Sequence, residues 1–261
     1  MTDIRLEQGL AGSGVPIGVS ELPEVFFEAV RRRFSLDESG RMLVLWQGAG
    51  AFLPFAGDFE SILLVDPEPG RLAESMWEAE RLGIENAIIL EGGMEILHPR
   101  MGRFRLLIVQ DAFLRKDRKR RISYLAKMAE PEGGVVIADV QRCGPPTDWQ
   151  KAALDVLRDR IGAERSKSHP TGFTAWDEPS LPFRYTETYS HHWSRKRTIG
   201  QAVTEILSAC CASFKERAVL EEPLRAALRK AEPSGVLEES LRLSAIFAWN
   251  GPDHGFAGGR G

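Results

Sequence analysis

Five short apolar runs alternate with helix-like segments over the first 140 residues, and this rhythm constrains the fold more than any other feature. The runs span residues 41–47, 61–66, 86–90, 104–110 and 133–139. Their nearly continuous hydrophobicity is typical of strands buried on both faces of a sheet. Strands that alternate with helices form βαβ units with parallel strands. The pattern therefore predicts an α/β protein with a doubly wound, mostly parallel, Rossmann-like sheet, to which helices and strands have been added.

The helices between these runs are also visible in the sequence. Residues 25–34 show helical spacing behind Ser20 as a candidate cap, residues 51–59 allow only a short crossover helix, and residues 118–129 form another helix. The segment 70–82 places four apolar side chains on one predicted buried face: Leu72, Met76, Ala79 and Leu82.

Four regions are expected along the chain. Residues 1–20 are a flexible arm, residues 21–140 the α/β core, and residues 251–261 a disordered tail. Residues 141–250 supply substrate-side additions and the last strand or strands of the same sheet. Within them we expect helices at 148–161, 196–213 and 220–231, a strand or hairpin arm at 183–193 and a strand at 244–249.

Charge and cysteine content exclude several classes of protein. With 34 Lys and Arg against 37 Asp and Glu, the net charge of −3 argues against binding to nucleic acid or to anionic membranes. The three cysteines are Cys143, Cys210 and Cys211, with no spacing typical of a metal site. We therefore expect a cytoplasmic protein with no metal, no disulfide framework, no secretion signal and no membrane span.

A glycine turn follows the first strand, and an acid ends the second. The first apolar run leads directly into Gly48-Ala49-Gly50, and the second ends in Asp66. Such a turn lets the backbone approach an adenosyl or phosphate group, and such an acid accepts hydrogen bonds from ribose hydroxyls. Two glycines alone are a weak signal, and by themselves they favour a purely structural turn.

Taken in order, four segments resemble the class I S-adenosylmethionine-dependent methyltransferases, in particular their bacterial small-molecule type. The segments are RMLVLWQGAG, LLVDPEPGRLAESMWEAERLGIENAIILEGG, GRFRLLIVQDAFLRKDR and EPEGGVVIAD. The likeness extends over about residues 20–250. It implies S-adenosylmethionine as the cofactor, with Gly48, Gly50 and Asp66 as the cofactor-binding positions that this chain retains.

Three positions depart from the cofactor pattern of that family. Val44 stands where the family has an acid, and Trp46 stands where it has the first glycine of the turn. Gly93 stands where the family has an acid that contacts the adenine amine. An indole at position 46 that pointed into the cleft would occupy the methionine end of the pocket, so these changes bring cofactor binding itself into question.

The acceptor side offers few groups for acid or base chemistry. Leu114 stands where the family pattern has a histidine, which leaves Asp111 as the best carboxylate at the cleft or, alternatively, as a turn cap. His192 is the second catalytic candidate. On a strand, however, His191 and His192 point to opposite faces, so at most one of them lines a pocket, and packing or surface roles are alternatives. The predicted substrate pocket comprises Trp46, Phe113, Arg115, Tyr189 and Trp193.

Three functions remain open. The first is a small-molecule methyltransferase that tailors a natural product in secondary metabolism. The second is a diverged, non-methylating relative with a degenerate cofactor motif, which acts as a cyclase, isomerase or lyase. The third is a non-catalytic subunit that pairs with an active homologue, or a binding module for a small ligand. As partners we expect a small-molecule substrate and either a second copy of the chain, in a homodimer, or a homologous enzyme.

Overall fold

The computed structural model describes residues 22–46, 48–114, 116–161, 181–210 and 214–251. The expected N-terminal arm lies outside them, as do Ser20, the predicted cap, and the expected C-terminal tail apart from Gly251, which is buried. The chain divides into two compact units. One, the sheet unit, comprises Ser20–Asp139, Ala175–His191 and Ser244–Gly261. The other, the helical unit, comprises Met1–Val19, Val140–Thr174 and His192–Leu243. Each is described separately below.

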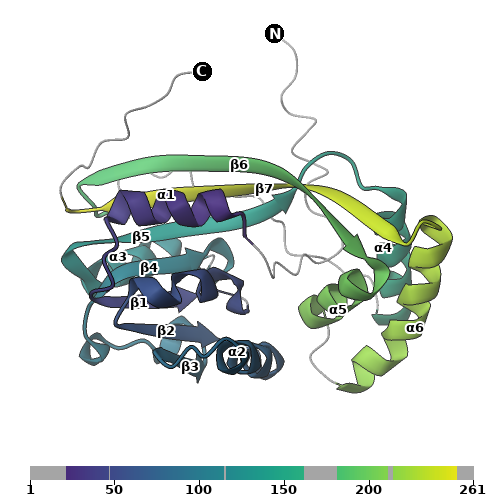
Figure 1. Cartoon of the computed structure of the whole chain (residues 1–261), viewed down its shortest axis with the longest axis horizontal. Helices are drawn as coiled ribbons and strands as arrows, with labels where there is room; N and C mark the ends of the chain where they lie inside the picture. Colours follow the sequence, from purple (N-terminus) through teal and green to yellow (C-terminus); the bar gives the residue numbers. More distant parts are fainter. Residues whose placement is uncertain (1–21, 47, 115, 162–180, 211–213, 252–261) are drawn as a thin grey trace, which may run out of the picture. The chain divides into compact units, whose positions relative to one another are not determined.

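The central sheet has seven strands in the order β3-β2-β1-β4-β5-β7-β6 (Figure 1). The strands are β1 (Arg41–Leu45), β2 (Ser61–Asp66), β3 (Ala87–Glu91), β4 (Phe104–Gln110), β5 (Ala129–Arg142), β6 (Tyr185–Thr198) and β7 (Val236–Trp249). The first five are parallel, with β1 between β2 and β4. This confirms the predicted doubly wound, mostly parallel sheet. The strand order reverses beside β1, which is where ligands bind in open α/β sheets.

The last three strands are longer than the sequence pattern predicted. Each of β5, β6 and β7 has 14 residues. Residues 196–198, predicted to be helical, belong to β6, and residues 236–243 extend β7 before the predicted strand at 244–249. In that extension exposed and buried residues alternate, as expected for a strand with one solvated face. Because of this alternation, residues 236–243 contain no continuous apolar run that would indicate a strand.

Three α-helices accompany the strands of the sheet unit: α1 (Glu24–Phe34), α2 (Pro69–Arg81) and α3 (Arg118–Met128). Two short 3₁₀ helices, η1 (Ala49–Ala51) and η2 (Leu53–Asp58), take the place of the single predicted crossover helix. Pro23 precedes α1 without a side-chain cap. The predicted buried face of α2 is only half correct. Leu72 and Ala79 are buried, whereas Met76 and Leu82 are 58% and 51% exposed.

The helical unit has an apolar core of its own. Its helices are α4 (Asp148–Ile161), α5 (Ile199–Cys210) and α6 (Phe214–Ala231). They bury a cluster that includes Trp149, Leu157, Ala202, Ile206, Leu224 and Leu237. None of the helices in the described part of the chain is long and apolar enough to cross a membrane.

Gly134 on β5 allows α1 and β7 to pack closely against the sheet. A Cβ at this position would lie 2.4 Å from the carbonyl oxygen of Ala248 and 2.4 Å from the ring of Phe34. We therefore expect Gly134→Ala to destabilise the protein by about 1–3 kcal/mol through overpacking. Gly57→Ala is the matched control, because a Cβ there meets no atom within 4 Å. Urea unfolding of both variants checks this, and equal losses of stability would contradict it.

Candidate functional site

The carboxyl ends of β1 and β2 bring together the glycine turn and the acid predicted from the sequence. Gly48 has φ +85°, a conformation that side-chain-bearing residues rarely adopt. Its N–H donates to a carboxylate oxygen of Asp66 over 3.1 Å. The Asp66 side chain is only 1% exposed at the end of β2. Gly50 is buried within η1. The site predicted for an adenosyl group is therefore assembled at the place where the fold positions ligands.

Asp66 is already occupied by partners from its own chain. Arg71, in the first turns of α2, donates from Nε over 2.8 Å and from Nη2 over 2.7 Å to its two oxygens. The Glu68 N–H donates to the same carboxylate over 2.9 Å. Together with Gly48, these donors use the roughly four acceptor positions of a carboxylate. We refer to Gly48, Asp66, Glu68 and Arg71 as the Asp66 cluster.

Arg71 therefore holds acceptor positions of Asp66 that ribose hydroxyls would need. A nucleoside diol can bind the carboxylate only if the two Arg71 hydrogen bonds open. The Arg71 side chain is 15% exposed, whereas that of Asp66 is 1% exposed. The residues fit an adenosyl group on condition that one side chain moves.

The third cofactor position has changed in a way that the sequence does not reveal. The N–H of Gly93, which stands in place of the expected acid, donates to the Glu95 carboxylate over 2.6 Å. A Cβ on Gly93 would lie 2.7 Å from the other Glu95 oxygen. The Glu95 carboxylate therefore occupies the space where a side chain at position 93 would begin.

Val44 and Trp46 are both part of the packed interior. Val44 has no exposed surface, and Trp46 is 1% exposed. The indole thus offers almost no surface to a ligand in this conformation. It fills the interior at the carboxyl end of β1, where the family pattern has a glycine.

Asp111, the first catalytic candidate, is buried in the 3₁₀ helix η5 (Asp111–Leu114) directly after β4. Arg118, at the start of α3, forms an ion pair with its carboxylate. Leu114 is fully buried. Arg115, predicted to line the pocket, lies outside the described residues. Asp111 is therefore a positioned, ion-paired carboxylate at the end of a strand.

The remaining pocket candidates differ in exposure. Tyr189 stacks on Phe247, with ring centroids 5.6 Å apart, and burial raises the pKa of its phenol. Along β6, half-buried and exposed residues alternate, so that Trp193 is half-buried and His192 exposed. Phe113 is half-buried in η5. His192 and Asp111 belong to different units, and their roles in catalysis remain predictions.

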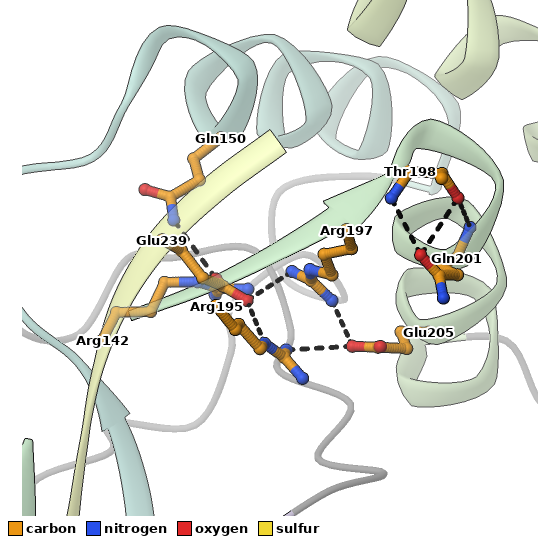
Figure 2. A network of polar contacts seen from close by, with 8 residues as sticks. All are labelled: Arg142, Gln150, Arg195, Arg197, Thr198, Gln201, Glu205 and Glu239. Carbon is orange, nitrogen blue, oxygen red and sulfur yellow. Dashed lines mark hydrogen bonds and ion pairs between the residues drawn. The ribbon is translucent and has the colours of Figure 1, made fainter. Parts of the chain in front are cut away.

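The helical unit contains a buried ionic network that sequence reasoning missed (Figure 2). Glu239 on β7 accepts from Arg142 Nε over 2.7 Å and from Arg195 Nε over 2.8 Å, and it lies 2.6 Å from Arg197 Nη2. Glu205 on α5 pairs with Arg195 at 3.0 Å and also with Arg197. We refer to these five residues as the arginine cluster.

Burial sets the direction of the pKa shift for three residues of the arginine cluster, Arg142, Arg197 and Glu205. It lowers the pKa of Arg197 to about 10 and also lowers the pKa of Arg142. It raises the pKa of Glu205, against the attraction of the neighbouring arginines. Burial alone would raise the pKa of Glu239 as well, but the surrounding guanidinium groups outweigh it and hold that pKa below its usual value.

For some of the residues that sequence reasoning missed, the spacing along the chain indicates that they lie close together. Arg195 and Arg197 are two positions apart in an alternating stretch, so a strand places both on one face. Arg71 follows Asp66 by five residues in the first turns of the next helix. By contrast, Arg142 and Glu239 are 97 residues apart, and only the fold brings them together.

Comparison with known proteins adds support for the fold. No protein-family model and no curated protein matches the sequence. A protein from Bacillus halodurans assigned as a methyltransferase has a TM-score of 0.51 at 13% identity, covering 87% of this chain and 100% of its own. For one from Anaeromyxobacter dehalogenans assigned as a type II methyltransferase, the TM-score is 0.51 and the identity 16%, covering 90% and 99%.

A protein named for a different reaction, a decarboxylation, has the same fold. Precorrin-8W decarboxylase of Methanobacterium thermoautotrophicum is similar to this chain with a TM-score of 0.50 and 12% identity, covering 89% of this chain and 92% of its own. At these identities the likeness concerns the fold. The chain has the fold of the class I S-adenosylmethionine-dependent methyltransferases, as the resemblance implied.

Proposed function

We propose that this protein binds an adenosyl cofactor at the Asp66 cluster and acts as a small-molecule methyltransferase. The observation that carries the proposal is the hydrogen bond from Gly48 N–H to Asp66 where the strand order reverses. A positive-φ glycine and a strand-end acid in one cluster suit an adenosyl ribose. The tailoring of a natural product is the role we infer from the family resemblance.

Residues of this chain can be matched to cofactor binding and to proton removal in such a reaction. S-adenosylmethionine, when bound, supplies a methyl group activated by a sulfonium sulfur. Gly48 and Asp66 would hold its adenosyl part, with Arg71 displaced from the carboxylate. Methyl transfer relies mainly on proximity and in-line alignment, so the protein needs a base only when the acceptor loses a proton. Asp111, held by Arg118, is the candidate for that role.

A second candidate function retains the fold without methyl transfer. Two observations favour it: donors of its own chain, two of them from Arg71, fill the acceptor positions of Asp66, and the Trp46 indole fills the interior at the end of β1. In this case the protein is a tailoring enzyme of another reaction class or a non-catalytic partner of a homologous enzyme.

Calorimetric titration with S-adenosylmethionine and S-adenosylhomocysteine decides between the two. The methyltransferase proposal predicts binding of both in the micromolar range and loss of binding in Asp66→Asn. If folded wild-type protein gives neither heat of binding nor a thermal shift with either compound, the second candidate is correct.

A further inference from the structure

Exposed apolar side chains of the sheet unit gather on α2, on the turn after it and on β3. Four of the seven large apolar side chains that are exposed in the described part of the chain lie between positions 76 and 88. They are Met76, Trp77, Leu82 and Ile88, with exposed fractions of 58%, 62%, 51% and 54%. The helix α2 packs against β3. Single exposed apolar residues need no explanation, but a group of them on neighbouring elements indicates an interaction surface.

The strand β3 is an open edge of the sheet (Figure 1). Its five residues, AIILE, are apolar up to the final Glu91. Natural edge strands usually resist further pairing through Lys, Pro or inward-pointing charges. The strand at the other edge, β6, carries such a protecting residue in Lys196. Pairing with another strand is therefore less opposed at β3.

The backbone of β3 shows which of its groups face outward. The Asn86 C=O accepts a hydrogen bond from the Ile62 N–H over 2.9 Å, and the Gly92 N–H donates to the Asp66 C=O over 3.1 Å. Residues of a strand bond alternately to one side and to the other, so positions 86, 88, 90 and 92 face β2. Among the described residues no strand lies beyond β3. The N–H and C=O groups that point to this open edge are those of Ala87, Ile89 and Glu91.

We infer that β3 pairs in antiparallel orientation with β3 of a second copy of this chain, about a two-fold axis at Ile89. In this register Ile89 lies opposite its own copy, and Ala87 lies opposite Glu91 of the second copy. Every outward N–H and C=O of the strand then has a partner. Glu91 faces an alanine and not a second carboxylate, so no like charges lie directly opposite each other. The exposed Ile88 meets Leu90 of the second copy, which removes apolar surface from water.

A second copy also fits the exposed side chains of α2. A stable interface buries about 800 Å² on each partner, more than one strand of five residues supplies. Because α2 packs against β3, the two-fold axis brings the two α2 helices side by side on one face of the joined sheet. Met76 and Trp77 lie on these helices and add apolar surface to the contact. The inference does not rest on the proposed methyl transfer.

Sedimentation equilibrium of the full chain tests whether the protein dimerises. We expect a monomer–dimer equilibrium at micromolar concentration in the wild type. Ile88→Lys places a charge at an exposed position of the edge strand, so it should fold, as circular dichroism checks, and weaken dimerisation by about tenfold or more. Val219→Lys, the same kind of change at a 56% exposed position of α6, should dimerise like the wild type. A wild type that stays monomeric throughout this range, or an undiminished dimer in folded Ile88→Lys, would overturn the inference.

Disulfide cross-linking tests the register. Ile88 and Leu90 of the second copy would form a closely spaced pair, with Cα atoms about 4.5 Å apart, which suits a disulfide. A mixture of Ile88→Cys and Leu90→Cys should therefore yield a disulfide-linked dimer upon oxidation. Either variant alone should give no more linked dimer than the oxidised wild type, which controls for the three cysteines of the chain. Equal yields from the mixture and from the single variants would place the contact elsewhere and contradict this pairing.

Discussion

Replacing Arg71 by methionine is expected to tighten the binding of S-adenosylhomocysteine by about tenfold to a hundredfold. In the wild type, ribose hydroxyls reach Asp66 only after both Arg71 hydrogen bonds, of 2.8 and 2.7 Å, have opened. Hydrogen bonds to charged groups contribute about 1.5–3 kcal/mol, and this cost disappears from the binding reaction in the variant. Isothermal titration calorimetry of both proteins measures the change.

Two controls separate this effect from a general change in the helix. Arg81→Met alters another arginine of α2, one that lies over Trp77 and not on Asp66, and should leave the affinity unchanged. Adding Asp66→Asn to Arg71→Met should abolish the gain, because the gain requires a free carboxylate. An affinity in Arg71→Met equal to or weaker than that of the wild type would mean that Arg71 does not close the site.

Replacing Glu239 by glutamine is expected to destabilise the protein by about 3–5 kcal/mol. The change leaves three buried guanidinium groups with Glu205 as the remaining carboxylate of the arginine cluster, and breaking a buried pair from one side costs about this much. Glu238→Gln is the matched control on the adjacent residue. Its side chain is 59% exposed and 3.9 Å from Lys196, so its loss should change stability by less than about 0.5 kcal/mol.

Denaturant unfolding of both variants checks the difference, and a double-mutant cycle assigns it to charge. Arg197→Met in the Glu239→Gln background removes one of the cations that has lost Glu239 as a partner and should recover part of the lost stability. Equal stability losses in Glu239→Gln and Glu238→Gln, or purely additive effects in the cycle, would show that the cluster is not a coupled network.

The core of the fold was predictable because buried parallel strands have a simple sequence signature. The runs at 41–47 and 104–110 are continuously apolar over residues 42–46 and 106–109, since both faces of β1 and β4 are covered there. The added strands have one solvated face, and charged residues interrupt their apolar positions. Met76 and Leu82 have helical spacing yet are exposed, because periodicity identifies a face and not the element that covers it.

The candidate site was predictable only as far as local motifs define it. Gly48 and Asp66 follow directly from the order strand, glycine turn, strand and acid. The partners of Asp66 depend on how the Arg71 side chain lies across the start of α2, which no spacing rule supplies. The hydrogen bond from the Gly93 N–H to the Glu95 carboxylate, two residues further on, likewise follows from the turn geometry and from no motif.

The most direct test of the account is a crystal structure of the protein soaked or grown with S-adenosylhomocysteine. If the Asp66 cluster binds the adenosyl group, the ligand lies at the carboxyl ends of β1 and β2, with its ribose hydroxyls on the Asp66 carboxylate and the Arg71 guanidinium displaced from it. A ligand bound elsewhere, with the Asp66–Arg71 pair intact, would contradict the proposal that this cluster is an adenosyl site.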